Sequence, residues 1–154
     1  MANDPEANLA ALEAAYARWS ETKGDNVDEI IGMFDEEIEM HSALSADVPD
    51  AISGVHVRHE EAAQYFEGLL RDWEMVKYDV DRFIVDAGGD DIVMVGRCAW
   101  RNKATGNVVE SPKVDIHTFR DGKVVRFQEV YDTLGFARAL GAVRDVEPAE
   151  MAKA

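Results

Sequence analysis

The chain has 154 residues, of which 47% are hydrophobic and 31% charged, and its formal net charge is −15. This length predicts a single domain over residues 1–154, with a core that needs no disulfide or metal cross-link. The acidic excess argues against nucleic acid and anionic membrane surfaces as partners, because affinity for phosphate groups comes from Lys and Arg.

The single cysteine, Cys98, cannot form an internal disulfide, and no neighbouring Cys or His indicates a metal site. Residues 1–6 are polar and acidic, without the basic and apolar regions of a signal peptide. No apolar run approaches the length of a membrane span. We therefore expect a cytoplasmic protein without a metal or other cofactor, whose cysteine is buried in a strand.

The first half of the chain predicts mainly helices. In chain order, the predicted elements are a helix over 6–23, a short helix over 27–34, a strand over 37–41, a loop over 42–57 and a helix over 59–73. Apolar residues at helical spacing, such as Leu12, Tyr16 and Trp19, indicate the first helix, and Gly24 ends it. The loop is predicted from its Ser, Pro and Gly residues.

The second half predicts an antiparallel meander followed by a short helix. The predicted strands cover 75–86, 92–102, 108–119 and 124–131, and the helix covers 134–140. Hairpin turns separate these strands, the last at Arg120-Asp121-Gly122, and Asp132 is expected to cap the helix. The acidic tail over 142–154 is expected to fray. These elements predict an α+β fold, with helices on one face of a strongly bent, mostly antiparallel sheet.

The last hairpin mixes ionisable and large apolar side chains on one face. Because side chains alternate along a strand, Asp115, His117 and Phe119 share a face of the first strand. On the second strand, alternation groups Val125, Phe127, Glu129 and Tyr131. A solvated face would not need these aromatic rings, and a plain core would avoid unpaired charges. The mixture therefore predicts a pocket.

The order of elements and several short motifs resemble the nuclear transport factor 2-like superfamily. The motifs are the first helix with its Gly24-Asp25 end, Ile38-Glu39-Met40-His41, Val114-Asp115-Ile116-His117-Thr118-Phe119, Asp121-Gly122-Lys123-Val124-Val125 and Glu129-Val130-Tyr131-Asp132. The resemblance covers residues 6–141 and is strongest to the SnoaL-like polyketide cyclase and ketosteroid isomerase branches. It implies a cone-shaped, cystatin-like domain that encloses a mostly apolar pocket and commonly forms a homodimer.

The resemblance also implies roles for three residues. Asp115 lies where ketosteroid isomerases have a protonated carboxylic acid that donates to an oxyanion. Glu129 aligns with the acidic base of SnoaL-like cyclases, and His41 lies at or beside the base position of the isomerases. We therefore predict that Asp115, Glu129 and His41 are catalytic, and that they transfer a proton next to a substrate carbonyl.

Two departures from the family pattern argue against specific activities. Arg97 matches one residue of the limonene-epoxide-hydrolase triad, but Ala99 replaces the partner aspartate. Tyr16 is the one candidate for the oxyanion tyrosine of steroid isomerases, and its spacing to Gly24 is about one residue out of step.

The predicted ligand is small and largely apolar. The residues expected to bind it are Tyr16, Trp19, Phe66, Arg97, His117, Phe119, Phe127 and Tyr131. Structural roles remain open for the charged residues, since Glu129 can pair with Arg97 or Lys113, and Asp115 can bind the backbone or His117. The alternative to an enzyme is therefore a ligand-binding or assembly module without catalysis.

The histidines outside the hairpin indicate no metal. His41, His56 and His59 lack the spacing of a zinc site.

A homodimer is predicted through the outer face of the sheet. The apolar residues assigned to that face are Val114, Ile116, Val124 and Val130, with Cys98 and Trp100 possible on the same side.

Overall fold

The structure is a computed structural model that describes residues 3–143, 149 and 152–153. Its helices and strands, in chain order, are α1 (Pro5–Thr22), α2 (Val27–Gly32), β1 (Phe34–Ser42), β2 (Val55–Val57), α3 (Arg58–Asp72), β3 (Trp73–Val85), β4 (Asp91–Asn102), β5 (Val108–Arg120), β6 (Lys123–Tyr131) and α4 (Thr133–Leu140). The α+β class expected from the sequence is confirmed.

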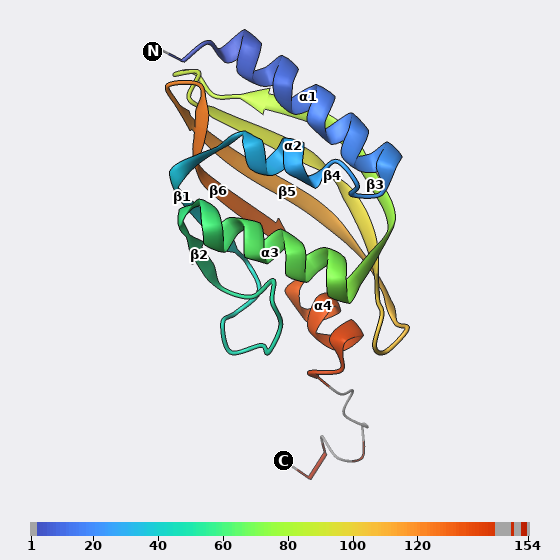
Figure 1. The fold of residues 1–154 in the computed structure, drawn as a ribbon. Helices are drawn as coiled ribbons and strands as arrows, with labels where there is room; N and C mark the ends of the chain where they lie inside the picture. Colours follow the sequence, from blue (N-terminus) through green and yellow to red (C-terminus); the bar gives the residue numbers. More distant parts are fainter. Residues whose placement is uncertain (1–2, 144–148, 150–151, 154) are drawn as a thin grey trace.

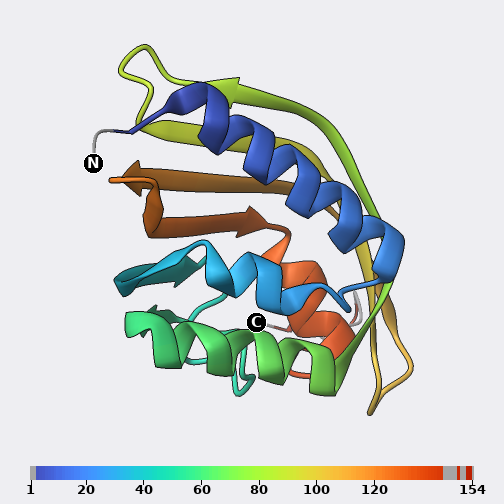
Figure 2. The ribbon, with the colours of Figure 1, turned by 45° about the horizontal axis from the view of Figure 1, so that its top comes forward.

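One curved sheet carries the fold, with its strands in the order β2-β1-β6-β5-β4-β3. Neighbouring strands are antiparallel, except that β1 and β6 run parallel. Helices α1, α2 and α3 lie side by side over the same face of the sheet, and α4 lies at one end (Figures 1 and 2). The sheet remains open, and its concave face together with these helices encloses the core.

Local sequence signals explain where helices begin and end. The side chain of Asp4 accepts a hydrogen bond from the amide of Ala7 at 3.1 Å, which caps α1 just before Pro5. The side chain of Asp132 caps α4 in the same way, through the amide of Gly135 at 2.9 Å. Gly141 then ends α4 with a positive φ of 85°, a conformation that glycine adopts without strain. The predicted capping role of Asp132 is confirmed.

The main element that the sequence pattern missed is β2. Residues 42–57 were expected to form a loop, but Val55–Val57 pairs with β1 as an edge strand. Three residues are too few to display a period-two pattern, so nothing local distinguishes this strand from the loop before it. Most of the tail predicted to fray, over 142–154, lies outside the described residues.

A β-bulge near the last hairpin changes which side chains of β6 face inward. Thr118 pairs with Arg126 whereas Phe119 pairs with Val124, so Val125 is an extra residue on β6. As a result Val124 is fully buried and Val125 is half-buried. Strict alternation had assigned these two valines to the opposite faces, which is wrong because the bulge reverses the alternation at this point.

The expected composition of the outer face also needs correction. Cys98 and Trp100 are both buried, on the inner face of β4, and Val124 joins them inside. The pairing of Cys98 with Ser111 and of Trp100 with Val109 aligns these residues with the buried positions of β5. The outer face retains Val114 and Ile116, which are half-buried, and Val130, which is 51% exposed.

No helix in the described part of the chain is both long and apolar enough to cross a membrane.

Candidate functional site

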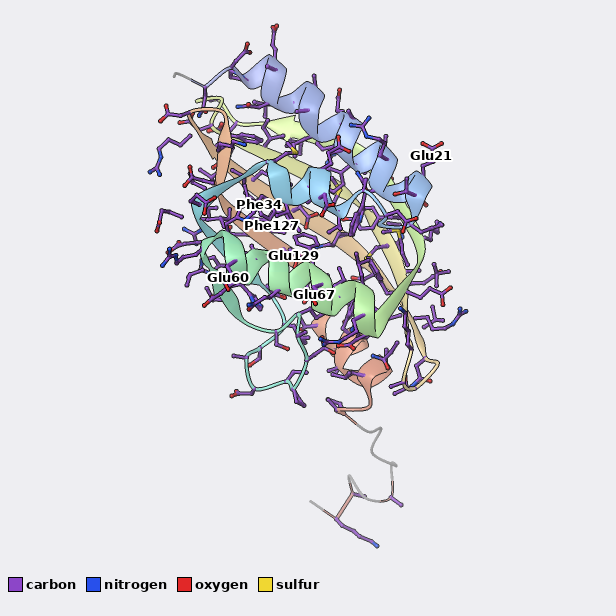
Figure 3. The ribbon with its side chains drawn as sticks, viewed as in Figure 1. Glu21, Phe34, Glu60, Glu67, Phe127 and Glu129 are labelled. Carbon is purple, nitrogen blue, oxygen red and sulfur yellow. The ribbon has the colours of Figure 1, made fainter. Side chains whose placement is uncertain are left out.

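A mostly aromatic cavity lies between the concave face of the sheet and the helices. Side chains from all four helices and from β1, β3, β4, β5 and β6 line it. In Figure 3 the labelled Phe34, Phe127 and Glu129 lie behind the helices, in the middle of the molecule, whereas Glu21, Glu60 and Glu67 lie on the helices. The cavity is therefore part of the core.

The cavity has a volume of about 50 Å³. A cavity of roughly 150 Å³ is needed to hold benzene, so a ligand with a ring requires side chains to move. Ile30 and Met33, near α2, line the cavity and are only half-buried. Because they are only half-buried, these two side chains can move outward at a smaller cost in packing than the buried residues of the lining.

Lys113 is the centre of a buried ionic cluster on the floor of the cavity. Its ammonium donates to Oδ1 of Asp115 at 2.6 Å and to Oε1 of Glu129 at 3.0 Å. All three residues are at least 93% buried, and strands β5 and β6 hold Asp115 directly opposite Glu129. Alternation along β5 brings Lys113 and Asp115 to the same face. The sheet thus gathers three charges within hydrogen-bonding distance in the core.

Asp115 accepts hydrogen bonds from three different elements. Besides Lys113, the hydroxyl of Tyr16 on α1 donates to Oδ2 at 2.6 Å, and that of Tyr78 on β3 donates to the same oxygen at 3.2 Å. Asp115 does not line the cavity, whereas Lys113, Tyr16 and Tyr78 do. Asp115 therefore contacts these three side chains from behind the cavity, as an acceptor of their hydrogen bonds.

Glu129 lines the cavity and is held from both sides. Lys113 binds Oε1, and the hydroxyl of Tyr65 on α3 donates to Oε2. The ring of Tyr131 stacks 5.2 Å from the Lys113 ammonium, and its hydroxyl lies 2.5 Å from the hydroxyl of Ser42. Glu129 is thus the carboxyl of the cluster that a ligand in the cavity can reach.

Burial and charge act in different directions on the groups of this cluster. Burial raises the pKa of Glu129, and this effect outweighs the opposing influence of Lys113. Burial alone would lower the pKa of Lys113, but attraction to Asp115 and Glu129 outweighs it and raises that pKa. Lys113 is therefore held as a cation, while Glu129 is poised to accept a proton.

The neighbouring aromatic groups stay neutral. Burial lowers the pKa of His117 to about 4, although Asp115 opposes this shift, and Nε2 of His117 lies 3.2 Å from the hydroxyl of Tyr16. Burial, followed by repulsion from nearby carboxylates, raises the pKa of Tyr16, Tyr65 and Tyr78. At neutral pH these tyrosines are hydrogen-bond donors and His117 is uncharged.

The structure brings most of the predicted ligand-binding residues together. The predicted residues that line the cavity are Tyr16, Trp19, Phe66, His117, Phe127, Glu129 and Tyr131. Phe119 is buried on the inner face, but beyond the cavity.

The structure does not bring His41 and Arg97 to the cavity. On β1, Ile38 and Met40 are fully buried, so His41 faces the other side, where its ring lies 3.6 Å from Glu39. Arg97 is exposed on the outer face of β4, and Glu129 pairs with Lys113 instead. The expectation that these two side chains face the cavity is wrong, because it relied on alignment with a family and not on the phase of each strand.

The sequence named Lys113 only as a possible partner of Glu129, and it gave no indication of two further polar residues of the site, Tyr65 and Tyr78. Lys113 precedes Asp115 by two positions in the same strand, so alternation alone would have added it to the cluster. Tyr65 and Tyr78 carry no such signal, because they come from α3 and β3 and meet the cluster only in the folded chain.

Among the described residues, no three His, Cys, Asp or Glu side chains lie close enough together to hold a metal ion. His56 and His59 instead have their Nε2 atoms 3.1 Å from backbone carbonyls, those of Ser53 and Ile31.

Comparison with solved structures identifies the same fold. A nuclear transport factor 2-like protein from Burkholderia thailandensis has a TM-score of 0.70 and 23% identity, over 90% of this chain and 98% of that one. TerC, co-crystallised with polyporic acid, has a TM-score of 0.66 and 19% identity, over 90% and 99%. A proposed isomerase from Bacillus subtilis has a TM-score of 0.74 and 12% identity, over 88% and 96%.

No curated protein sequence matches the chain significantly. The family profile of the SnoaL-like domain, however, matches residues 12–127, from α1 into β6. The α+β fold, the cavity between the sheet and the helices and this match agree with one another. The chain belongs to the SnoaL-like domain family, within the nuclear transport factor 2-like superfamily.

Proposed function

We propose that the protein binds a small, largely apolar carbonyl compound in the cavity and transfers a proton next to the carbonyl without a cofactor. The observation that carries this proposal is Glu129, a buried carboxyl that lines an aromatic cavity beside a fixed ammonium. A raised pKa suits a carboxylate that removes a proton from carbon, because it makes the carboxylate a stronger base.

In the proposed mechanism Glu129 is the base. It takes the proton from the carbon next to the carbonyl, and the enolate oxygen develops negative charge beside the Lys113 ammonium. Asp115 acts as a positioning residue, since it holds Lys113, Tyr16 and Tyr78 without reaching the cavity. His41 has no part in this mechanism, because its side chain lies on the other face of β1.

The comparisons support a role of this class. One protein of the same fold was co-crystallised with polyporic acid, and another is a proposed isomerase. We also propose that two copies associate through the outer face of the sheet, where Val130 is half exposed among the apolar side chains of Val114 and Ile116.

The test is hydrogen–deuterium exchange at the α-carbon of small cyclic ketones, followed by NMR. We expect exchange in the presence of the protein, and we expect Glu129→Gln to slow it by about 100- to 10,000-fold, the usual contribution of a general base. Glu110→Gln is the matched control, because Glu110 is exposed on β5 and should leave the rate unchanged. A rate that is equal in the protein and in Glu129→Gln would contradict the proposal.

One observation favours a second candidate, binding without catalysis. Both oxygens of Glu129 already accept hydrogen bonds, from Lys113 and Tyr65, and this leaves the carboxylate less free to attack a C–H bond. Ketones that bind without exchanging their α-protons would favour this second function.

A further inference from the structure

The Lys113 ammonium has one more hydrogen-bond donor than its partners use. An ammonium carries three N–H groups, and two of them bind Asp115 and Glu129. No third acceptor for Lys113 is present among the described residues, and its side chain lines the cavity. The remaining N–H group is thus available to an acceptor atom on a ligand.

The cluster contains one cation and two carboxyl groups, so it carries one net negative charge while both carboxyls are ionised, and it can take up one proton. Buried net charge is costly, and the carboxyl that receives less support from donors takes up a proton more readily. Asp115 accepts three hydrogen bonds and Glu129 accepts two. Glu129 is therefore the site that gains or loses the proton, and it is also the carboxyl that faces the cavity.

The groups that act on Glu129 come from six elements. They are Tyr16 on α1, Tyr65 on α3, Tyr78 on β3, Cys98 on β4, Lys113 and Asp115 on β5, and Tyr131 on its own strand β6. Among them Lys113 is the one cation and Asp115 the one other carboxyl. Burial keeps the tyrosine hydroxyls and the Cys98 thiol protonated at neutral pH, so the proton balance involves Glu129 and the ligand.

We propose that the ligand carries a weakly acidic hydroxyl group, as in a phenol or the enol of a 1,3-dicarbonyl compound, and that it binds as an oxyanion on Lys113 while Glu129 takes its proton. The O–H bond of the ligand breaks, its oxygen keeps the electron pair, and the proton joins a carboxylate oxygen of Glu129. The total charge is unchanged, because the ligand oxyanion replaces the Glu129 carboxylate as the second anionic partner of Lys113.

This inference rests on the proposed function in one respect, that the same cavity binds the ligand. It adds the chemical class of the ligand and the destination of its proton. The raised pKa of Glu129 supports it, because proton transfer from a weakly acidic hydroxyl needs an acceptor of similar proton affinity. A neutral ether or ester of the same shape cannot make this exchange, so the cavity should discriminate against it.

The test uses 4-nitrophenol and its methyl ether, 4-nitroanisole, as probes. The absorption spectrum of 4-nitrophenol differs between the phenol and the phenolate and so reports the charge of the bound probe. We expect the spectrum of the phenolate in the complex at a pH where the free probe is neutral, and binding at least about tenfold tighter than that of 4-nitroanisole. The same measurements are made on Met33→Ala, which widens the cavity at a half-buried position. This variant shows whether a probe fails to bind because the cavity is too small for it.

The pH dependence of binding provides a second readout. Above the pKa of the free probe, the protein must take up one proton for each phenolate bound, so its affinity should fall about tenfold for each pH unit. In Glu129→Gln no proton is taken up, so the affinity should stay level over the same range. A variant that merely disturbed packing would weaken binding without changing this slope. Glu110→Gln should keep the slope of the unchanged protein.

The possible outcomes separate the two proposals. Equal affinity for both probes, or a bound 4-nitrophenol with the spectrum of the neutral phenol, overturns the acidic-hydroxyl class and leaves the apolar binding cavity intact. Absence of binding by both probes, in the protein and in Met33→Ala, overturns the binding cavity as well. Lys113→Met should lose the phenolate spectrum. If Lys113→Met fails to fold, the level pH dependence expected of Glu129→Gln is the deciding test, and a slope equal to that of the unchanged protein overturns the role of Glu129.

Discussion

Over residues 113–117, the two faces of strand β5 reverse the composition that is usual for a half-buried strand. The concave face buries Lys113, Asp115 and His117, whereas the convex face leaves Val114 and Ile116 partly exposed. Ordinarily one face of an antiparallel strand packs apolar residues on the core and the other presents polar residues to water. Over residues 113–117 of this strand the ionisable residues are inside, and the valine and isoleucine are outside.

This inversion has a different physical basis on each face. On the inside, each charge has a partner, since Lys113 binds two carboxylates and Asp115 also accepts from two tyrosines. Buried charges of this kind add little stability over apolar residues, which points to a chemical role. On the outside, apolar side chains without cover are typical of a surface that another protein contacts. This difference supports the proposals that the inner face carries the chemistry and that the outer face associates with a second copy.

The largest effect expected on stability follows removal of the buried cation. Lys113→Met leaves Asp115 and Glu129 facing each other without a counter-charge, which should lower the free energy of unfolding by about 3–5 kcal/mol. Urea denaturation measures this change. Adding Glu129→Gln to Lys113→Met should restore part of the loss, because it removes one of the two uncompensated charges. An unchanged midpoint in Lys113→Met would mean that the cluster is not charged.

A somewhat smaller loss of stability is expected from the protonation of His117 as the pH falls. Its pKa of about 4 in the folded protein is below the ordinary value of 6.5, so the folded state binds fewer protons than the unfolded state. The stability that this difference supplies is complete above about pH 6.5 and is lost as the pH falls toward 4, by on the order of 3 kcal/mol.

His117→Gln tests this prediction, because glutamine cannot take up the proton. The difference in unfolding free energy between the protein and His117→Gln should narrow as the pH falls from about 6.5 to about 4. Taking the difference cancels the titration of Glu129, whose raised pKa acts in the opposite direction and favours the folded state at low pH. Parallel pH profiles would show that His117 titrates normally.

A change on the outer face should alter association and spare the fold. Val130→Asp puts a charge on a side chain that is 51% exposed, so the folded monomer should tolerate it. In a dimer it should cost on the order of 2 kcal/mol per buried valine. Sedimentation at micromolar concentration should show a dimer for the protein and a larger monomer fraction for Val130→Asp. A monomer in both cases would remove the associating role of this face.

The smallest change in stability is expected for Arg97, an exposed cation on the outer face that serves as the comparison for the buried Lys113. Arg97→Met removes the same charge from the outer face, where solvent already screens it, and should change the free energy of unfolding by less than about 0.5 kcal/mol. The affinity for 4-nitrophenol should also be unchanged. A loss of binding in Arg97→Met would contradict the assignment of chemistry to the inner face alone.

The sequence by itself determined the helices, the long strands and the last hairpin, since these depend on local periodicity and turn residues. Asp121 and Gly122 both have positive φ, and the turn they form brings Asp115 directly opposite Glu129, as the hairpin pattern predicted. Asp115 and Glu129 were therefore identified before the fold was known. So were the aromatic walls at Tyr16, Trp19 and Phe127.

Only the tertiary structure decided which of these residues face the cavity and what they contact. The bulge beside Phe119 exchanged the faces of Val124 and Val125, and the phases of β1 and β4 turned His41 and Arg97 outward. Tyr65 lies 64 residues along the chain from its partner Glu129, and Tyr78 lies 37 residues from its partner Asp115. Such contacts depend on sheet register and helix packing, which are set by the whole core and leave no signal in the neighbouring residues.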